Sequence, residues 1–167
     1  MPESPAINPA VPHPARVYDF WLGGKDNYKA DSDAAAEAIK IFPKTVESAR
    51  SCRAFLSRVV TYLTAEAGIR QFLDLGSGLP SAQNVHEVAQ SIAPESRVVY
   101  VDHDPARMSE LNPDLPATLR SRQQVRDLFA GLDLVKPGVV QISRWRPESD
   151  REARAAAALW GGVARKP

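Results

Sequence analysis

Residues 71–101 constrain the fold most strongly, because two short apolar segments flank a glycine turn and an amphipathic stretch. The first apolar segment, Gln71–Leu75, runs into Gly76-Ser77-Gly78, and the second is Arg97–Val101. Between them, apolar side chains recur every three or four residues up to Pro94, which predicts a helix. Strand, turn, helix and strand in so short a span predict parallel strands joined by a right-handed crossover. The chain is therefore predicted to be an α/β protein.

The turn Gly76-Ser77-Gly78 lies where a strand of such a unit would deliver the backbone to a bound cofactor. Glycine is required there because a Cβ would collide with the ligand or forbid the dihedral angles. Asp102 directly follows the second strand, where it can accept hydrogen bonds from both hydroxyls of an adenosine ribose. A turn that merely connects strand to helix is the alternative. The presence of two acids, Asp74 just before the turn and Asp102 after the second strand, favours a cofactor site.

The form of the turn indicates which cofactor it suits. A dinucleotide-binding turn reads G-x-G-x-x-G, and here Ser81 stands at the third glycine position. The shorter Asp74-Leu75-Gly76-Ser77-Gly78 suits a cofactor without a pyrophosphate to dock on the helix N-terminus. A carboxylate at Asp74 would repel a pyrophosphate, but it can lie beside a sulfonium or an amino group. An NAD-binding protein is therefore the less favoured alternative.

The remainder of the chain divides at Arg16. Residues 1–15 contain five prolines and little that could be buried, which predicts a disordered lead-in. Residues 16–167 are predicted to form one domain, with a cofactor-binding part over 16–105 and a C-terminal helix and strand pair over 118–167.

Periodicity and breakers predict the elements outside the βαβ unit. In RVYDFWLGGKDNY the apolar positions fit neither a helix nor a strand for long, and Gly23-Gly24 breaks the pattern. Helices are predicted over Asp31–Phe42, with Ala36 and Ile39 facing inward, and from Pro43 to a C-cap at Gly68. A third helix is predicted over Ser121–Leu132. Two strands that would pair antiparallel are predicted over Leu134–Ile142 and Leu159–Arg165.

Several classes of function are disfavoured. With 21 Lys and Arg against 20 Asp and Glu, the net charge of +1 gives no reason to expect nucleic acid or an anionic membrane as a partner. No apolar run approaches the ~20 residues of a membrane helix, and there is no secretory signal. His13, His86 and His103 lack metal-ligand spacing, so no metal site is expected. The single Cys52 agrees with a reducing cytoplasm.

Six sequence motifs together resemble one known family. They are ARVYDFWLGGKDNY, QFLDLGSGLPSAQNVHEVAQ, RVVYVDHDP, TLRSR, GLDLVKPGVVQISRWRP and GGVARK. In combination they closely resemble the actinobacterial S-adenosylmethionine-dependent methyltransferase family, formerly a domain of unknown function. The resemblance covers residues 15–105 and 117–167.

This resemblance implies a Rossmann-like class I methyltransferase fold with an N-terminal helical extension, and S-adenosylmethionine as the cofactor. The residues it implies at the cofactor are Asp74, Gly76, Ser77 and Gly78 on the methionine side, Asp102 at the ribose and His103 beside the adenine. The N-terminal residues implied to fold over the same pocket are Arg16, Tyr18, Gly23, Gly24, Lys25, Asp26 and Asn27. Neither a catalytic residue nor the methyl acceptor follows from the sequence.

The chain departs from the family in its middle. Family members carry a long segment between the second strand and TLRSR, which supplies the third to fifth strands, whereas here only Ala106–Ala117 fill that interval. A truncated fold with exposed strand edges is predicted, and with it low stability or homo-oligomerisation. A non-catalytic remnant or binding module of the same fold is the alternative to an active methyltransferase.

Overall fold

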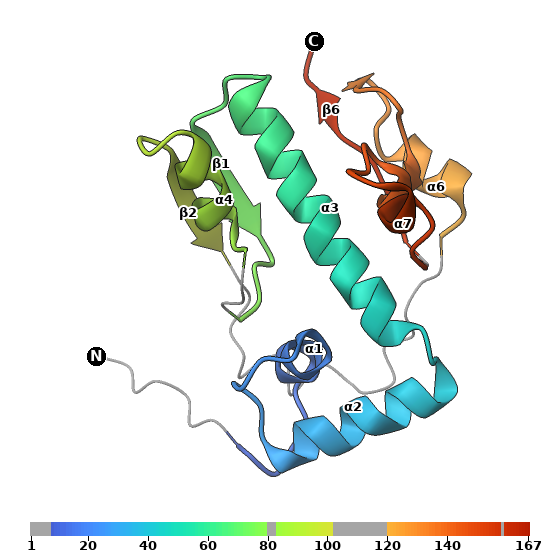
Figure 1. Cartoon of the computed structure of the whole chain (residues 1–167). Helices are drawn as coiled ribbons and strands as arrows, with labels where there is room; N and C mark the ends of the chain where they lie inside the picture. The colour runs from blue at the N-terminus through green and yellow to red at the C-terminus, as the bar shows by residue number, and fades with distance from the viewer. Residues whose placement is uncertain (1–7, 80–82, 102–119, 158) are drawn as a thin grey trace.

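The computed structural model describes residues 8–79, 83–101, 120–157 and 159–167. One long helix, α3 (Thr45–Ala65), runs diagonally through the molecule and separates two groups of elements (Figure 1). The βαβ unit lies on one side of it, and the C-terminal segment (residues 120–157 and 159–167) lies on the other. Helices α1 (Pro14–Leu22) and α2 (Lys29–Ile41) close one end. The predicted α/β class is confirmed.

The βαβ unit consists of β1 (Gln71–Leu75), α4 (Val85–Ile92) and β2 (Arg97–Val101). The two strands are parallel, in register from Gln71 opposite Arg97 to Leu75 opposite Val101, as predicted. One face of the pair packs on a buried cluster of α3 and α4 side chains, to which the strands contribute Phe72 and Val98. Apolar residues at helical spacing on both helices therefore build the core that positions β1.

The opposite face of this two-stranded sheet is apolar and exposed. Leu73 and Leu75 on β1 are 62% and 69% exposed, and Val99 and Val101 on β2 are 59% and 45% exposed. The register sets Leu73 beside Val99 and Leu75 beside Val101, so the four side chains share one face. We call these four residues the open sheet face. Among the described residues, no third strand pairs with β1 or β2.

The N-terminal region contains a helix that the sequence pattern did not predict. Helix α1 begins at Pro14, so the predicted boundary at Arg16 lies inside it, and His13 caps it and is buried. Its mixed aromatic and charged residues gave no clear period because Asp19, an acid, is one of its buried positions. The predicted break is confirmed: the helix ends at Leu22, and Gly23 adopts the left-handed conformation, with φ +82°.

Helices α2 and α3 lie close to where the sequence predicts them. Helix α2 buries Ala35 and leaves Ala36 exposed, so the prediction for Ala36 was wrong, whereas Ile39 is half-buried. Helix α3 ends at Ala65 with Glu66 at the C-cap, so the C-cap predicted at Gly68 was two residues too late; Gly68 itself adopts φ +68°.

The C-terminal segment differs from the prediction in the length of its elements. Helix α6 covers only Arg122–Asp127, about half of the predicted helix. Instead of two strands there are four short ones, β3 (Asp133–Leu134), β4 (Val140–Gln141), β5 (Trp160–Gly161) and β6 (Ala164–Arg165). They pair antiparallel, β3 with β6 and β4 with β5, so the predicted direction of pairing is confirmed.

A turn at residues 136–138 divides the predicted strand Leu134–Ile142. Pro137 has no N–H to offer a ladder, and Gly138 adopts φ +85° and donates its N–H to Val135 O at 2.8 Å. The stretch between the two predicted strands contains a short helix, α7 (Asp150–Ala153).

Trp145 and Arg58 join the C-terminal segment to α3. Trp145 is fully buried and meets Phe55 and Tyr62 of α3 edge to face. The buried Arg58 guanidinium donates to Trp145 O at 2.8 Å and to Ile142 O at 2.7 Å. Helix α3 is thus packed by the sheet on one side and by this aromatic cluster on the other.

Candidate functional site

The glycine turn (Gly76–Gly78) follows the carboxyl end of β1. Gly76 and Gly78 adopt φ values of +77° and +68°, a conformation that residues with a Cβ rarely take. Gly76 N–H donates to Val101 O at 2.7 Å, which ties the turn to the end of β2. No described atom lies within 4 Å of a Cβ built on either glycine. The turn therefore has room for a ligand beside its backbone.

Asp74 lies two residues before this turn. Its side chain is half-buried, and it makes no hydrogen bond or ion pair with any residue that the structure describes. A half-buried carboxylate without such a partner retains its capacity to bind a cation or an N–H donor. Asp74 and the open turn thus fit a ligand that presents a positive charge.

Tyr100 lies opposite Asp74 in the register of the two strands. The Tyr100 hydroxyl accepts from His86 N at 2.9 Å and lies 2.6 Å from His86 Nδ1. No role was predicted for Tyr100, and His86 was considered only as a metal ligand. Cross-strand pairing could have singled out Tyr100, because Asp74 and Tyr100 occupy equivalent positions in their strands.

The N-terminus of α4 carries a carboxylate of its own. Asn84 caps the helix, and Glu87 Oε2 accepts from Asn84 N at 2.8 Å in a capping box. A pyrophosphate at this helix end would meet the negative charge of Glu87. Of the other residues predicted near the turn, Ser77 lies in it, half-buried, whereas Asp102 and His103 lie outside the described residues.

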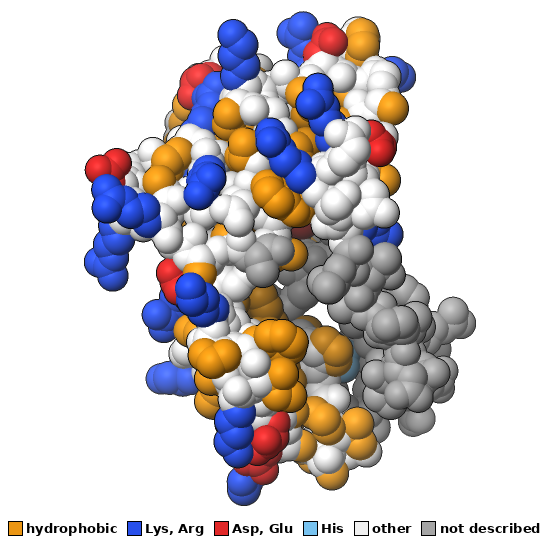
Figure 2. Space-filling model, turned by 90° about the vertical axis from the view of Figure 1, so that its right-hand side faces the viewer, with side chains coloured by type: hydrophobic (Ala, Val, Ile, Leu, Met, Phe, Trp, Pro, Cys, Tyr) orange, Lys and Arg blue, Asp and Glu red, His pale blue; other side chains and the backbone are white. Residues whose placement is uncertain are grey.

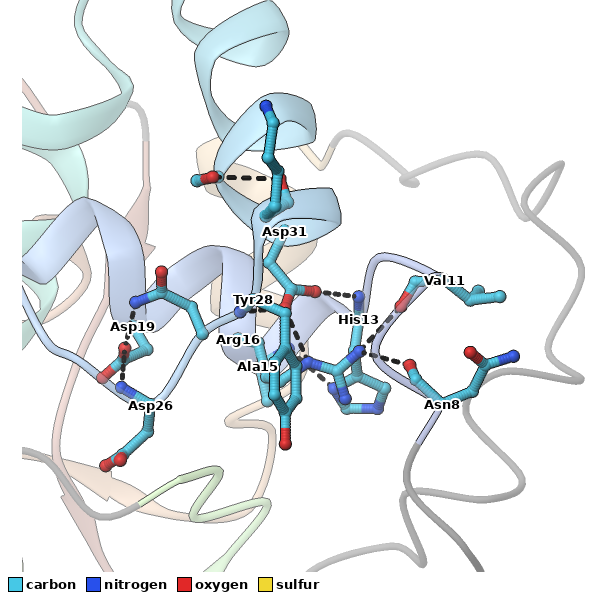
Figure 3. Close-up of polar contacts among 12 residues, drawn as sticks. Asn8, Val11, His13, Ala15, Arg16, Asp19, Asp26, Tyr28 and Asp31 are labelled. Atoms are coloured by element: carbon cyan, nitrogen blue, oxygen red, sulfur yellow. Dashed lines mark hydrogen bonds and ion pairs between the residues drawn. The ribbon is translucent and has the colours of Figure 1, made fainter.

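A second group of predicted site residues lies in the N-terminal corner (residues 13–31), which consists of α1, a loop and the start of α2 (Figure 3). Asp31 is the centre of this corner and is fully buried. Its carboxylate accepts from His13 N at 2.7 Å, from Arg16 Nε at 2.7 Å and from Tyr28 N at 2.8 Å. Arg16 also donates to Val11 O at 2.7 Å. One carboxylate therefore holds three parts of the chain together.

The charge of Asp31 is matched to this environment. Burial by itself would raise its pKa, but hydrogen bonds from Arg16, Tyr28 and His13, together with the Arg16 charge, hold the pKa below its ordinary value. Arg16 forms an ion pair with Asp31, and its side chain is only 12% exposed.

Asp19 organises the loop of the same corner. Its Oδ2 accepts from Asp26 N at 3.0 Å and from Asn27 Nδ2 at 2.8 Å. A Cβ on Gly24 would overlap this carboxylate, so glycine is required at that position. Buried Asp19 thus accounts for both the glycine and the asparagine in GGKDN.

The N-terminal residues predicted at the cofactor are in this way brought together, largely by contacts among themselves. Tyr18 donates its hydroxyl to Ala49 O at 3.1 Å, which fastens α1 to α3. The side chains of Lys25 and Asp26 have no hydrogen bond or ion pair to another described residue. Sequence reasoning missed Asp19 and Asp31. For Asp31 a signal existed, since an acid at the third position of a helix is the capping-box pattern.

Two further properties of the described part of the chain bear on the site. Within the described residues, no three His, Cys, Asp or Glu side chains gather as a metal ion would need. In the same part of the chain, no helix combines the length and apolarity needed to cross a membrane.

The chain is similar to known proteins over nearly its whole length. A family model described as S-adenosyl methyltransferase matches residues 1–112 and 106–167. The structure of a DUF574 family protein from Streptomyces avermitilis is 27% identical, with a TM-score of 0.81 over 94% of this chain and 98% of that chain. A proposed methyltransferase from Thermobifida fusca is 30% identical, with a TM-score of 0.81 over 94% and 96% of the two chains. No curated protein matches the sequence.

Proposed function

Because the chain belongs to the S-adenosyl methyltransferase family, we propose that it binds S-adenosylmethionine at the glycine turn and directs the methyl group to an acceptor. The observation that carries the proposal is the glycine turn, where a Cβ built on Gly76 or Gly78 meets no described atom, beside the Asp74 carboxylate, which has no partner among the described residues. In this proposal the backbone of the turn contacts the methionine part, and Asp74 attracts its ammonium group. Asp102 accepts from the ribose hydroxyls, and His103 lies beside the adenine.

The chemistry comes from the cofactor, whose sulfonium activates the methyl group, and the protein contributes orientation. In this proposal, fewer residues of the N-terminal corner reach the cofactor pocket than the resemblance implies. Arg16 and Asn27 are occupied by Asp31 and Asp19. Lys25 and Asp26 are therefore the residues of this corner that we expect to reach a cofactor.

NAD is disfavoured as the ligand. A dinucleotide needs its pyrophosphate at a helix N-terminus that follows the glycine turn. In this chain Glu87 already places a carboxylate at the start of α4. A cofactor that presents a cation instead of a pyrophosphate suits both Glu87 and Asp74.

Titration calorimetry with S-adenosylmethionine and with NAD tests the proposal. We expect binding of S-adenosylmethionine alone, weakened about tenfold in Asp74→Asn and unchanged in the matched surface variant Asp33→Asn. Binding of NAD with no binding of S-adenosylmethionine would refute the proposal.

A shortened family domain is the second part of the proposal. The open sheet face and the absence of a further described strand beside β1 support it. Exposed apolar faces favour association of copies. We therefore expect concentration-dependent self-association in sedimentation, which the double variant Leu73→Ser/Leu75→Ser should reduce.

Methyl transfer itself is tested with a labelled methyl donor. If the shortened domain is a non-catalytic remnant, it binds S-adenosylmethionine without turnover. Transfer of label to an acceptor above background would instead establish an active enzyme.

A further inference from the structure

The structure contains a cavity of about 760 Å³ away from the glycine turn. It lies between α1, the corner where α2 meets α3, and the part of the C-terminal segment around α7. Its described lining includes no residue of β1, the glycine turn or β2. The volume is within the range of small-molecule sites, which are about 300–1,000 Å³.

The walls of this cavity are largely apolar. Tyr18 and Trp21 of α1 meet edge to face there, with their ring centroids 6.3 Å apart. Ile41 and Phe42 line the cavity and are 70% and 68% exposed, and Leu159 closes the other side. Figure 2 shows hydrophobic side chains gathered in the lower half of the face that carries the α2–α3 corner. Apolar side chains so exposed to water favour an apolar ligand.

Three cationic residues line the same cavity: Lys44, Arg144 and Arg154. Arg154 pairs with Asp150 at 3.3 Å, but Lys44 and Arg144 form no ion pair with a described residue. No Asp or Glu belongs to the described lining. Lys and Arg side chains also predominate over the upper half of this face, where the C-terminal segment lies (Figure 2). The cavity is therefore apolar inside and positively charged at its border.

The polar groups in the wall add no opposing charge at neutral pH. Burial raises the pKa of Tyr18 to about 12, and burial also raises the pKa of the Cys52 thiol. Both groups therefore stay neutral, and Tyr18 is already bonded to Ala49 O. An anion in the cavity would meet only cations and neutral groups among the described residues.

We propose that this cavity is a binding site for an apolar carboxylic acid, whose carboxylate pairs with Lys44 and Arg144 while its apolar body lies against Trp21 and Phe42. An Arg guanidinium is suited to a carboxylate because it can donate two parallel hydrogen bonds. The inference does not depend on methyl transfer, because no group of the glycine turn takes part in it.

The test uses two probes of nearly equal shape, 1-naphthaleneacetate and its neutral amide. We expect the acid to bind the full-length protein at least tenfold more tightly than the amide in calorimetry at low salt. Added salt should weaken binding of the acid and leave binding of the amide unchanged. Equal affinities for acid and amide, or no binding of the acid at millimolar concentration, would overturn the proposal.

Substitutions locate the site. Lys44→Gln/Arg144→Gln, at two exposed positions, should abolish the preference for the acid without changing the thermal midpoint. The control Lys40→Gln/Arg126→Gln removes the same charge outside the cavity and should keep the preference. Ala153→Trp, which fills the cavity, should weaken acid and amide alike. If the Lys44→Gln/Arg144→Gln variant still prefers the acid over the amide, the carboxylate does not pair with these two residues and the assignment is contradicted.

A comparison of wild type with Gly76→Val separates this site from the cofactor site. Both proteins should bind 1-naphthaleneacetate with the same affinity, because the valine lies at the glycine turn and not in the cavity. Loss of acid binding in Gly76→Val, with the fold intact by circular dichroism, would mean that the acid occupies the glycine turn, and the proposal would fail. Acid binding is measured without S-adenosylmethionine. The result can therefore be interpreted even if the protein does not bind that cofactor.

Discussion

The glycine turn and the N-terminal corner were predicted to line one pocket, but they use their polar groups in opposite ways. In the corner, Asp31 and Asp19 together accept five hydrogen bonds from their own neighbourhood. At the turn, Asp74 has no partner among the described residues, and no described atom lies within 4 Å of a Cβ built on Gly76 or Gly78. A sequence motif can therefore maintain a fold or hold a ligand, and the partners of its polar atoms distinguish the two roles. Substitutions in the corner should change stability, and substitutions at the turn should change binding.

The largest expected effect is that of Asp31→Ala. It leaves the Arg16 charge and two backbone N–H groups without their acceptor, and removing one partner of a buried ion pair costs about 3–5 kcal/mol. Urea unfolding at pH 7 measures the loss. An unchanged midpoint would show that the corner does not stabilise the fold.

The same variant has a definite pH dependence. Since the folded-state pKa of Asp31 is lowered, its stabilisation is present above the unfolded pKa of about 3.9 and is lost as pH falls below that value. The difference between wild type and Asp31→Ala should therefore be constant from pH 7 to 5 and shrink below about pH 4.

Gly24→Ala should have the next largest effect. Its Cβ overlaps the Asp19 carboxylate, which must move away from Asp26 N and Asn27, at a cost of about 2–4 kcal/mol. Gly23→Ala is the matched control. It has a positive φ but free space around its Cβ, so it should cost only about 1–2 kcal/mol of strain. If the control proved as harmful as Gly24→Ala, the overlap with Asp19 would not be the cause.

Gly76→Val tests the opposite side of the comparison. It should cost about 1–2 kcal/mol of stability through its φ of +77°, keep the helix content, and lower S-adenosylmethionine affinity beyond detection. Gly131→Val is the control, because Gly131 has φ +80°, equal free space and a position in the C-terminal segment. Calorimetry should find normal binding in that control. Normal binding in Gly76→Val would place the pocket elsewhere.

Asp102→Ala should have the smallest effect of the series. Loss of a charged acceptor of the ribose hydroxyls should weaken S-adenosylmethionine binding by about 1.5–3 kcal/mol and leave stability unchanged. Asp133→Ala, an exposed acid in β3, serves as the control. Equal affinity of both variants would show that Asp102 does not contact the ribose.

The sequence predicted the βαβ unit well and the terminal regions less well, for physical reasons. In β1, α4 and β2 the buried residues are apolar, so burial appears directly as a hydrophobic period. In α1 and at the start of α2, two of the buried residues are Asp19 and Asp31, which no hydrophobic period can reveal. In the C-terminal segment, Pro137 and Gly138 divide an apolar run that otherwise has the composition of one strand.

The candidate site follows the same rule. The glycine turn was predictable because its requirement is local: two backbone conformations and a missing Cβ. The partners of Arg16 and Asn27 were not predictable from the sequence. Asp31 and Asp19 become their partners only when α1, the loop and α2 have packed together. Tyr100 and His86 meet only when β2 pairs with β1 and α4 crosses over them.

The position of α3 between two groups that share no strand pairing has a consequence for amide hydrogen exchange. The β1–β2 ladder is separate from the β3–β6 and β4–β5 ladders among the described residues. The first packs on α3 through its buried core, and the C-terminal segment that carries the other two ladders joins α3 through Arg58 and Trp145. The βαβ unit and the C-terminal segment can therefore open separately, and their strand amides should exchange through that local opening. The central amides of α3, covered from both sides, should exchange only when the whole chain unfolds. Two sets of fast-exchanging strands around one slow helix would be the signature of this arrangement.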